Sequence, residues 1–329
     1  MGPAGQRRLH ESRVCLIGCG GLGCVLADTL VRAGVGHLRI CDRDFVEIDN
    51  LQRQALFDES DVEANLPKAE AARIKLARIN STVQVEAAVL DVNHTNIERL
   101  AAGAHLLLDG TDNFETRYLI NDLAVRSQRP WVYGAVVGTT GLCMPVIPGD
   151  GPCLRCVFEE PPPLELSPTC DTAGVLGSAV NVVASLQATE ALKILTGHIG
   201  DLHRGLTSID LWSGRWVTLH VGRTPRAGCP CCTERRFEYL DGTRLATAVS
   251  LCGRNAVQIN RTGGGAVDFA AMAAKLRGVA SGAMRCNRFM LQASIAGFEL
   301  TLFCDGRALI QGTADLDVAK AVYAKYVGA

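Results

Sequence analysis

The most informative chemical pattern is a glycine-rich turn after the first apolar run of the chain. Gly18, Gly20 and Gly23 have the spacing G-x-G-x-x-G, and Gly21 adds a fourth glycine. Such a turn lets a phosphate approach the backbone closely, and the helix that it opens presents free N–H groups to an anion. Asp42 ends the next apolar run, where a ribose would be bound. The pattern predicts a nucleotide site but does not by itself separate NAD, FAD, SAM and ATP.

Polar side chains further along favour ATP with a metal ion over a nicotinamide. Arg53 and Lys68 supply two cations, and Asp112 follows an apolar strand predicted at 105–109. Strand ends line the ligand crevice of a doubly wound sheet, so these groups and Asn50 are expected to converge there. The cations would neutralise phosphates, and the carboxylate would hold Mg²⁺. Taken singly, each cation could equally be a solvated surface charge.

Four cysteines form a pattern typical of a structural metal site. Cys153 and Cys156 make one C-x-x-C pair, and Cys229 and Cys232 make a second. Two such pairs suit one tetrahedral zinc ion held by four thiolates, with no position left open for catalysis. Cys231 leaves the second pairing slightly ambiguous, although Cys229 with Cys232 keeps the usual spacing. The competing interpretation is a set of unrelated core or surface cysteines.

Another cysteine, Cys170, lies in a polar segment just before a predicted helix at 174–196. A helix N-terminus keeps a thiol partly ionised, which suits a nucleophile. No partner base can be identified by spacing, so an idle exposed cysteine is the alternative. The cysteines in apolar or strand-like contexts are expected in the core; they are Cys15, Cys19, Cys24, Cys41, Cys143, Cys252, Cys286 and Cys304.

The elements that must position these residues alternate between strands and helices. Strands are predicted at 13–18, 36–42, 83–89, 105–109, 131–137, 141–147, 206–211 and 215–221. Helices are predicted at 22–34, 66–79, 95–102, 113–128 and 174–196. This order implies an α/β fold: a doubly wound, mostly parallel Rossmann-like sheet with helices on both faces and antiparallel C-terminal strands.

Composition changes after the second cysteine pair. Residues 1–233 are expected to form the nucleotide-binding domain, 234–247 a charged linker, and 248–329 a small α+β domain. Strands of this last part are predicted at 255–260, 288–295, 298–304 and 306–311, and helices at 268–278 and 315–327.

Bulk properties exclude several classes of protein. The chain has 329 residues, of which 48% are hydrophobic and 20% charged, as in a folded globular protein. Its formal net charge of −1 argues against a general nucleic-acid or membrane-surface binder, because such proteins carry a basic excess. No apolar segment predicts a membrane span or a signal peptide. We therefore expect a cytoplasmic protein, and in that compartment patterned cysteines more often bind metal or do chemistry than form disulfides.

Together the motifs resemble the ThiF/MoeB/HesA family of adenylyltransferases, the prokaryotic relatives of ubiquitin-activating enzymes. The matching segments follow the family's order over about residues 2–232. They are 13–23, 33–36, 42–44, 49–54, 67–68, 110–113, 153–156, 173–177, 185–193 and 228–232. The joint match is far more specific than any single motif.

The resemblance implies a nucleotidyltransferase. It would use ATP and Mg²⁺ to adenylate the C-terminal Gly-Gly carboxylate of a ubiquitin-like sulfur-carrier protein of the ThiS or MoaD kind, releasing pyrophosphate and preparing thiocarboxylate formation. It also implies a homodimer with shared sites and a sulfur donor such as a cysteine desulfurase or a rhodanese.

The family's functional residues carry over to matching positions. Asp42 would bind the ribose, while Asn50, Arg53 and Lys68 would contact the phosphates. Asp112 would hold Mg²⁺, and Cys170 would match a mobile-loop cysteine that some members use for a persulfide or thioester. The rest of the implied nucleotide site comprises Gly18, Gly20, Gly21, Gly23, Asp44, Gln54 and Asn113. Zn²⁺ would be bound by Cys153, Cys156, Cys229 and Cys232.

Two departures from the family pattern stand at the ends of the chain. Relatives begin with a helix whose arginine reaches the partner's ATP site, whereas residues 1–9 resemble the linker after that helix. We therefore expect an N-terminally truncated chain; the alternative is a natural chain in which Arg7 or Arg8 substitutes or activity is weak. The tail lacks the size of a rhodanese domain, and a docking or regulatory domain is expected there, with a purely structural cap as the alternative.

Two other functions remain open from the sequence. One is an adenylating enzyme of the same fold acting on a peptide or RNA-borne carboxylate; the zinc pattern and the lack of a basic excess count against the RNA version. The other is a catalytically weak nucleotide-binding scaffold that acts through its tail. The retained Arg53, Lys68 and Asp112 count against the scaffold.

Overall fold

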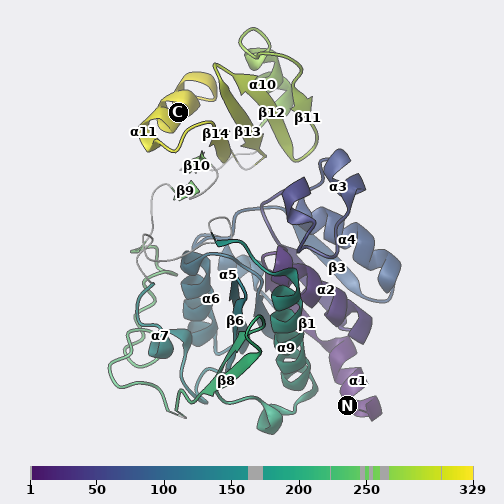
Figure 1. Ribbon diagram of the computed structural model, residues 1–329, viewed down its shortest axis with the longest axis vertical. Coiled ribbons are helices and arrows are strands. Elements are labelled where there is room, and N and C mark those ends of the chain that lie inside the picture. Colours follow the sequence, from purple (N-terminus) through teal and green to yellow (C-terminus); the bar gives the residue numbers. More distant parts are fainter. Residues whose placement is uncertain are drawn as a thin grey trace. The chain divides into compact units, whose positions relative to one another are not determined.

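The chain forms two compact units, 1–244 and 245–329, each described here by itself. The computed structural model describes residues 2–161, 173–222, 224–244, 249–251, 255–259, 267–304 and 306–328 (Figure 1). The division between the units falls within the segment that composition marked as a connector.

The first unit is built on an eight-stranded sheet in the order β3-β2-β1-β4-β5-β6-β7-β8. Its strands are β1 (Arg13–Ile17), β2 (His37–Cys41), β3 (Gln84–Ala88), β4 (Leu106–Asp109), β5 (Trp131–Val137), β6 (Thr140–Val146), β7 (Leu206–Asp210) and β8 (Arg215–Leu219). The first five strands in this order, from β3 through β2, β1 and β4 to β5, pair in parallel with their neighbours. Strands β6, β7 and β8 continue the sheet with antiparallel pairing. The predicted mostly parallel sheet with antiparallel C-terminal strands is confirmed.

Helices cover both faces of this sheet because the strands are apolar on both sides. They are α1 (Gly2–Glu11), α2 (Gly21–Ala33), α3 (Glu59–Glu63), α4 (Lys68–Ile79), α5 (Ile97–Leu100), α6 (Phe114–Ser127), α7 (Leu154–Val157) and α9 (Gly177–Thr196), with 3₁₀ turns η1 (Ile48–Asn50) and η3 (Ile199–Asp201). In β1, Val14 and Leu16 enter the core beneath α2, α4 and α9. Cys15 and Ile17 enter the core beneath α5 and α6 (Figure 1).

Local chemistry sets the ends of the helices that carry the site. Helix α2 ends at Gly34, whose φ of +88° is a left-handed conformation suited to glycine. Helix α6 begins at Asn113, whose side chain accepts a hydrogen bond from the backbone N–H of Thr116 at 2.9 Å. These boundaries fix where the two loops before α2 and α6 leave the sheet.

The N-terminal residues correct the expectation of a linker. Residues 2–11 form α1, whose Leu9 is fully buried among the side chains of the first core. Arg8 donates from Nη1 to the backbone oxygen of Thr196, at the end of α9, at 3.0 Å. A segment that begins with glycine and proline and has little apolar periodicity gave no sign of this helix.

Residues 234–244 pack on the first unit. Phe237, Tyr239 and Leu240 are buried in the core beneath α6, and the ring of Tyr239 lies 5.0 Å from that of Tyr118. The backbone N–H of Tyr239 donates to Asp122 in α6 at 3.0 Å. This charged segment therefore holds three apolar anchors.

The second unit is an antiparallel sheet with two helices. The strand order is β11-β12-β13-β14-β10-β9. The elements are β9 (Val249–Leu251), β10 (Ala256–Ile259), α10 (Phe269–Leu276), β11 (Arg285–Cys286), β12 (Met290–Ile295), β13 (Phe298–Phe303), β14 (Ala308–Gln311) and α11 (Leu316–Tyr326). Residues such as Leu291, Leu302 and Val322 close its own core, as expected of a small α+β fold.

The cysteines expected in the core divide into three groups. Cys15, Cys19, Cys24, Cys41 and Cys143 are buried. Cys286 is exposed, because it lies on the two-residue edge strand β11, and Cys304 is half-buried. Cys252 lies outside the described residues. None of the described helices is long and apolar enough to cross a membrane.

Candidate active site and metal centre

The glycine turn between β1 and α2 packs directly against the loop that follows β4. Gly18 has a φ of +89°, and a Cβ there would lie 2.5 Å from the backbone oxygen of Gly110. A Cβ on Gly23 or on Gly110 would lie 2.2 or 2.4 Å from the oxygen of Gly18. At Gly20, by contrast, the nearest atom would be 3.9 Å away. Three glycines therefore hold two loops together, and Gly20 leaves its surface open.

Asp42, at the end of β2, is tied to the glycine turn. Its Oδ2 accepts from the backbone N–H of Cys19 at 2.6 Å, and its Oδ1 accepts from that of Asp44 at 2.7 Å. Partial burial raises the pKa of Asp42, as does the Asp44 carboxylate, while Lys68 lowers it. The carboxylate keeps lone pairs available beside the turn, as a group that binds ribose hydroxyls requires.

Lys68 begins α4 and lies buried among carboxylates. Its Nζ is 3.4 Å from Oδ2 of Asp44, and its backbone N–H donates to the oxygen of Asp44 at 2.8 Å. Burial would lower the pKa of Lys68, but Asp44, Asp42 and Asp112 together outweigh it and raise that pKa. The ammonium is therefore charged near neutral pH.

The segment after β2 lines the same region with buried amides. Asn50 and Gln54 are 0% and 3% exposed, and neither Asn50 Oδ1 nor Gln54 Oε1 has a hydrogen-bond partner within the described part of the chain. Buried polar atoms are almost always paired, so these two acceptors point to a ligand. Half-buried Arg53 donates from Nη1 to the backbone oxygen of Asp49 at 3.0 Å.

Asp112 and Asn113 occupy the loop after β4. Asp112 is exposed and makes no hydrogen bond or ion pair with any residue the structure describes. Its charge nevertheless raises the pKa of both Lys68 and Arg43, which places it near them. Asn113 is used as the cap of α6.

The structure thus brings most of the predicted nucleotide residues to one edge of the sheet, at the carboxyl ends of β1, β2 and β4. Sequence reasoning missed Arg43, which pairs with Asp91 at 2.7 Å and with Asp44 at 3.7 Å. Its place directly after Asp42 was the available signal. Cys170 lies outside the described residues. Of the two N-terminal arginines, Arg8 is bound to the end of α9.

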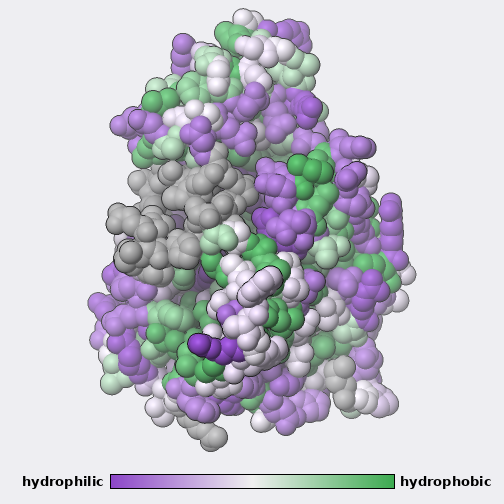
Figure 2. All heavy atoms as spheres, viewed as in Figure 1, coloured by the Kyte–Doolittle hydropathy of each residue, from purple (hydrophilic) through white to green (hydrophobic). Residues whose placement is uncertain are grey.

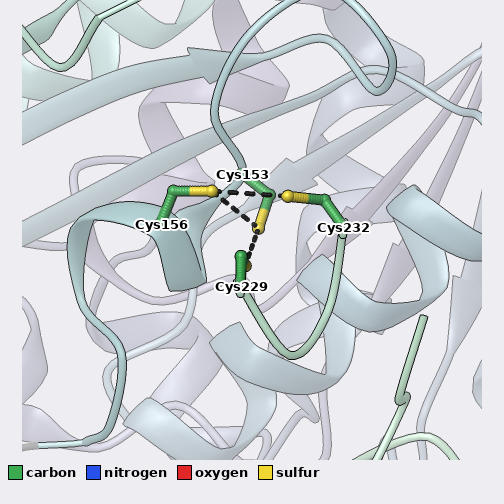
Figure 3. Close-up of side chains that lie close together, drawn as sticks. All are labelled: Cys153, Cys156, Cys229 and Cys232. Atoms are coloured by element: carbon green, nitrogen blue, oxygen red, sulfur yellow. Dashed lines mark hydrogen bonds between the residues drawn. The ribbon is translucent and has the colours of Figure 1, made fainter. Parts of the chain in front are cut away.

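The four paired cysteines form one cluster, drawn in Figure 3. Their sulfur atoms all lie within 4.8 Å of one another. The Sγ–Sγ distances are 3.9 Å for Cys153–Cys156, 3.6 Å for Cys153–Cys229 and 3.3 Å for Cys156–Cys232. Zn–S bonds of about 2.3 Å in a tetrahedron require sulfur separations of about 3.8 Å. The cluster therefore fits Zn²⁺.

Helix α6 resolves the ambiguity over Cys231. The Nδ2 of Asn121 donates to the sulfur of Cys231 at 3.2 Å, and its Oδ1 accepts from the backbone N–H of Leu154 at 2.9 Å. Cys231 thus belongs to the support of the cluster, which is formed with Cys229 and Cys232 as the spacing favoured. One asparagine holds both cysteine pairs against the helix that starts beside Asp112.

Comparison with known proteins decides the family. The model of the ThiF family matches residues 1–231. The chain belongs to the ThiF family. The chain is similar to the sulfur carrier protein ThiS adenylyltransferase of Bacillus subtilis, to which it is 43% identical over 328 residues, all of this chain and 96% of that protein. The sulfur carrier protein adenylyltransferase of Thermus thermophilus is 40% identical over 239 residues, 71% of this chain and 87% of that protein.

A solved structure shares the fold of this ThiF-family chain. Escherichia coli MccB with ATP superposes with a TM-score of 0.60 at 22% identity, covering 70% of this chain and 69% of MccB. At this identity the likeness supports the fold alone.

Proposed function

We propose that this chain is a sulfur-carrier protein adenylyltransferase. It uses ATP and Mg²⁺ to adenylate the C-terminal Gly-Gly carboxylate of a ubiquitin-like carrier protein. The observation that carries the proposal is the grouping of Lys68, Asp112 and the glycine turn at one sheet edge. The chain that holds this group is 43% identical, along its whole length, to a ThiS adenylyltransferase.

The reaction requires charge to be offset where it builds. A carboxylate oxygen of the carrier attacks the α-phosphorus, the bond from that phosphorus to the β-phosphate oxygen breaks, and pyrophosphate leaves. Lys68 and Arg53 stabilise the phosphate oxygens during this displacement. Mg²⁺, when bound, supplies further neutralisation and orients the phosphates. Asp112, exposed beside Lys68, is the side chain we assign to hold it.

The remaining nucleotide contacts follow from the free groups at the crevice. Asp42 binds the ribose, and the N–H groups at the start of α2 bind phosphate beside Gly20. The free acceptors of Asn50 and Gln54 suit hydroxyl groups or metal-bound water. A flip of either amide presents its NH₂ group to a phosphate instead.

A protein substrate also needs a docking surface, and the β7–β8 hairpin supplies a candidate. Trp212 and Trp216 are 81% and 55% exposed, and β8 is one of the two edge strands of the sheet. Exposed apolar groups on a free edge mark protein contacts. Asp210, at the end of β7, accepts from the hydroxyl of Thr139 beside the carboxyl end of β5 at 2.8 Å. The hairpin tip therefore shares an edge with the nucleotide crevice.

Figure 2 shows pale and green spheres over α9 and β8 with hydrophilic groups around them. We assign this surface to the globular part of the carrier. Its C-terminal tail would then extend along the sheet edge toward the glycine turn.

The four-cysteine cluster completes the assignment. Cys153, Cys156, Cys229 and Cys232 bind a Zn²⁺ that ties the loop after β6 to the segment after β8. With four thiolates as ligands, the ion leaves no position for substrate. Cys170, outside the described residues, is the candidate for covalent sulfur chemistry, which Cys170→Ser would test.

We further propose a cytoplasmic homodimer that works with a sulfur donor. Free thiols in the described part of the chain suit a reducing compartment. Light scattering on the purified chain tests the dimer. Thiocarboxylate formation with a cysteine desulfurase or a rhodanese as donor tests the second partner.

Pyrophosphate–ATP exchange tests the proposed reaction. The full chain is incubated with a small carrier ending in Gly-Gly, and with the same carrier extended by one alanine. We expect exchange only with the free Gly-Gly end, and its loss in Asp112→Asn. Absence of exchange with Gly-Gly carriers, or full exchange in Asp112→Asn, would reject the proposal and favour the peptide enzyme or the scaffold.

A further inference from the structure

A buried carboxylate, Asp109, lies at the end of β4 behind the exposed Asp112. Asp109 is fully buried, and its Oδ1 accepts from both the backbone N–H of Thr111, at 2.9 Å, and the hydroxyl of Thr111, at 2.7 Å. Its Oδ2 faces the backbone N–H of Gly134 at 3.4 Å. The carboxylate therefore contacts both the loop after β4 and strand β5.

Arg117, one turn into α6, holds the same loop from the other side. Its Nε lies 3.3 Å from Oδ2 of Asp109, and its Nη2 donates to the backbone oxygen of Thr111 at 2.8 Å. The guanidinium lies 5.4 and 5.6 Å from the ring centres of Phe114 and Tyr133. Both backbone groups of Thr111 are therefore fixed by one buried ion pair.

Helix α9 adds a third support. The Nε2 of Gln187 donates to the backbone oxygen of Asp109 at 2.8 Å and to that of Val132 at 3.3 Å. A Cβ on Gly134 would lie 2.2 Å from the side chain of Gln187, so β5 keeps a glycine where the amide crosses it. The end of β4 is thus held by groups from both faces of the sheet.

We propose that Asp109, Arg117 and Gln187, the Asp109 cluster, are positioning residues that set the orientation of Asp112 toward the divalent cation of MgATP. The inference rests on the proposed function, since it concerns the same crevice. Asp112 makes no hydrogen bond or ion pair with the described residues, so the backbone of its loop largely sets where its carboxylate lies. The Asp109 cluster supplies that restraint at the preceding residue. Groups that orient a metal ligand typically alter metal affinity or activity 10–100-fold when removed.

The need to fix the loop at Thr111 also explains why the buried Asp109 cluster is charged rather than apolar. A hydrophobic pair of similar volume could fill the space equally well and often with equal stability. It could not accept from the backbone N–H of Thr111 while donating to its carbonyl oxygen. The ion pair therefore specifies a loop conformation, not merely a packed volume.

The test compares cation affinity with stability in the full chain. Mn²⁺, read by electron paramagnetic resonance, is titrated into protein and ATP without any carrier. Asp109→Asn keeps the shape of the side chain and removes its charge. Arg117→Lys keeps the positive charge but loses the guanidinium group that contacts both Asp109 and the backbone oxygen of Thr111. Thr111→Val removes the hydroxyl that donates to Asp109. We expect the Mn²⁺ midpoint to rise about 10-fold in the first two variants and less in Thr111→Val.

Glu190→Gln is the matched control. Glu190 is a buried carboxylate of α9 paired with Lys193 at 2.6 Å and with the backbone N–H of His203 at 3.0 Å, and it has no part in the loop. It should lower the melting temperature without moving the Mn²⁺ midpoint.

The proposal is overturned if Asp109→Asn and Arg117→Lys only lower the melting temperature and bind Mn²⁺ as the parent does. If Asp109→Asn does not fold, the Mn²⁺ midpoints of Arg117→Lys and Thr111→Val decide: unchanged midpoints in both overturn the proposal. Failure of the proposed function can be told apart from failure of this inference. In that case the parent protein would show no carrier-dependent exchange, but it would still bind Mn²⁺ with ATP, and that binding would still depend on Asp109.

Discussion

Helix α6 connects two sites of opposite character. At its N-terminus lies the nucleotide crevice, where Asp112 is exposed and Asn50 and Gln54 keep buried acceptors without partners. Along its length, Asn121 supports the four-cysteine cluster, whose ligand atoms all face one another. The crevice leaves polar groups available for a substrate, whereas the four sulfur atoms of the cluster point toward one another. Substitutions should therefore affect activity at the first site and stability at the second.

The largest effect is expected at the cluster. Cys229→Ser removes a fully buried ligand, and structural zinc contributes on the order of 10 kcal/mol to folding in small domains. We expect loss of bound zinc, measured by metal analysis, and a fall in melting temperature of at least ten degrees, on the order expected for several kcal/mol. Cys231→Ser is the control and should retain the metal. Unchanged stability in Cys229→Ser would remove the contrast between the sites.

Asp112→Asn should show the reverse pattern. The exposed side chain contributes little to folding, so the melting temperature should stay within a degree or two, roughly as for other surface substitutions. Carrier-dependent exchange should fall about 10²–10³-fold, because an electrostatic group at a reacting phosphate is lost. A nearby carboxylate substitution in the first turn of α6, Glu115→Gln, should exchange normally. A large loss of stability in Asp112→Asn would mean that the crevice is also structural.

A third prediction concerns pH and the buried side of α6. Burial raises the pKa of Asp122 to about 6, above the unfolded value, although Tyr239 N–H and Arg155 oppose the shift. Between about pH 4 and 6 the unfolded chain loses this proton first, so the free energy of unfolding falls as pH rises, by about 3 kcal/mol in total. Above pH 6 the contribution is constant.

Asp122→Asn keeps an acceptor for Tyr239 and should flatten this part of the stability curve. Chemical denaturation at pH 4.5 and 7 measures the slope in parent and variant. Equal slopes would show that Asp122 is ionised throughout, and that the support of the cluster is less shielded from water than its burial indicates.

The smallest effects separate two glycines of one turn. Gly20→Ala meets no atom nearer than 3.9 Å and should fold normally, yet weaken ATP binding about tenfold, because the backbone can no longer approach phosphate. Gly18→Ala meets the oxygen of Gly110 at 2.5 Å and adopts a positive φ, so it should mainly lower stability. Calorimetric titration with ATP and thermal melting distinguish them. Similar behaviour of both variants would contradict the division of roles.

Periodicity predicted the first unit well because its strands are short apolar runs separated by long helices. The alternation of strands and helices, the glycine turn and the pairing of four cysteines all follow from local pattern. Asp109 was read as the end of an apolar strand, and Gln187 as part of a small-residue helix. Neither follows a spacing rule, because Asp109 reaches Gly134 in β5, and Gln187 reaches Asp109 and Val132, which lie far from it in the sequence.

Other features also depend on contacts far apart in the chain. The helix at 2–11 is stabilised where Leu9 packs beneath α9, not by its own composition. Cys286 was expected in the core from its apolar or strand-like context, but an edge strand of two residues leaves it exposed. Lys68 could have been a surface charge, and only the fold surrounds it with Asp44 and Asp42.

The contact between Gly18 and Gly110 has a consequence for the order of events in folding. β4 lies beside β1, although β2 and β3 come between them in the chain. The phosphate-binding turn is synthesised early, but the loop with Gly110 that packs against it forms only when β4 inserts beside β1. Asp109 gains its partners Arg117 and Gly134 only after α6 and β5 have been synthesised. Forming contacts so distant in sequence is slow. A nascent chain should therefore remain unable to bind ATP until the strand after α6 has left the ribosome.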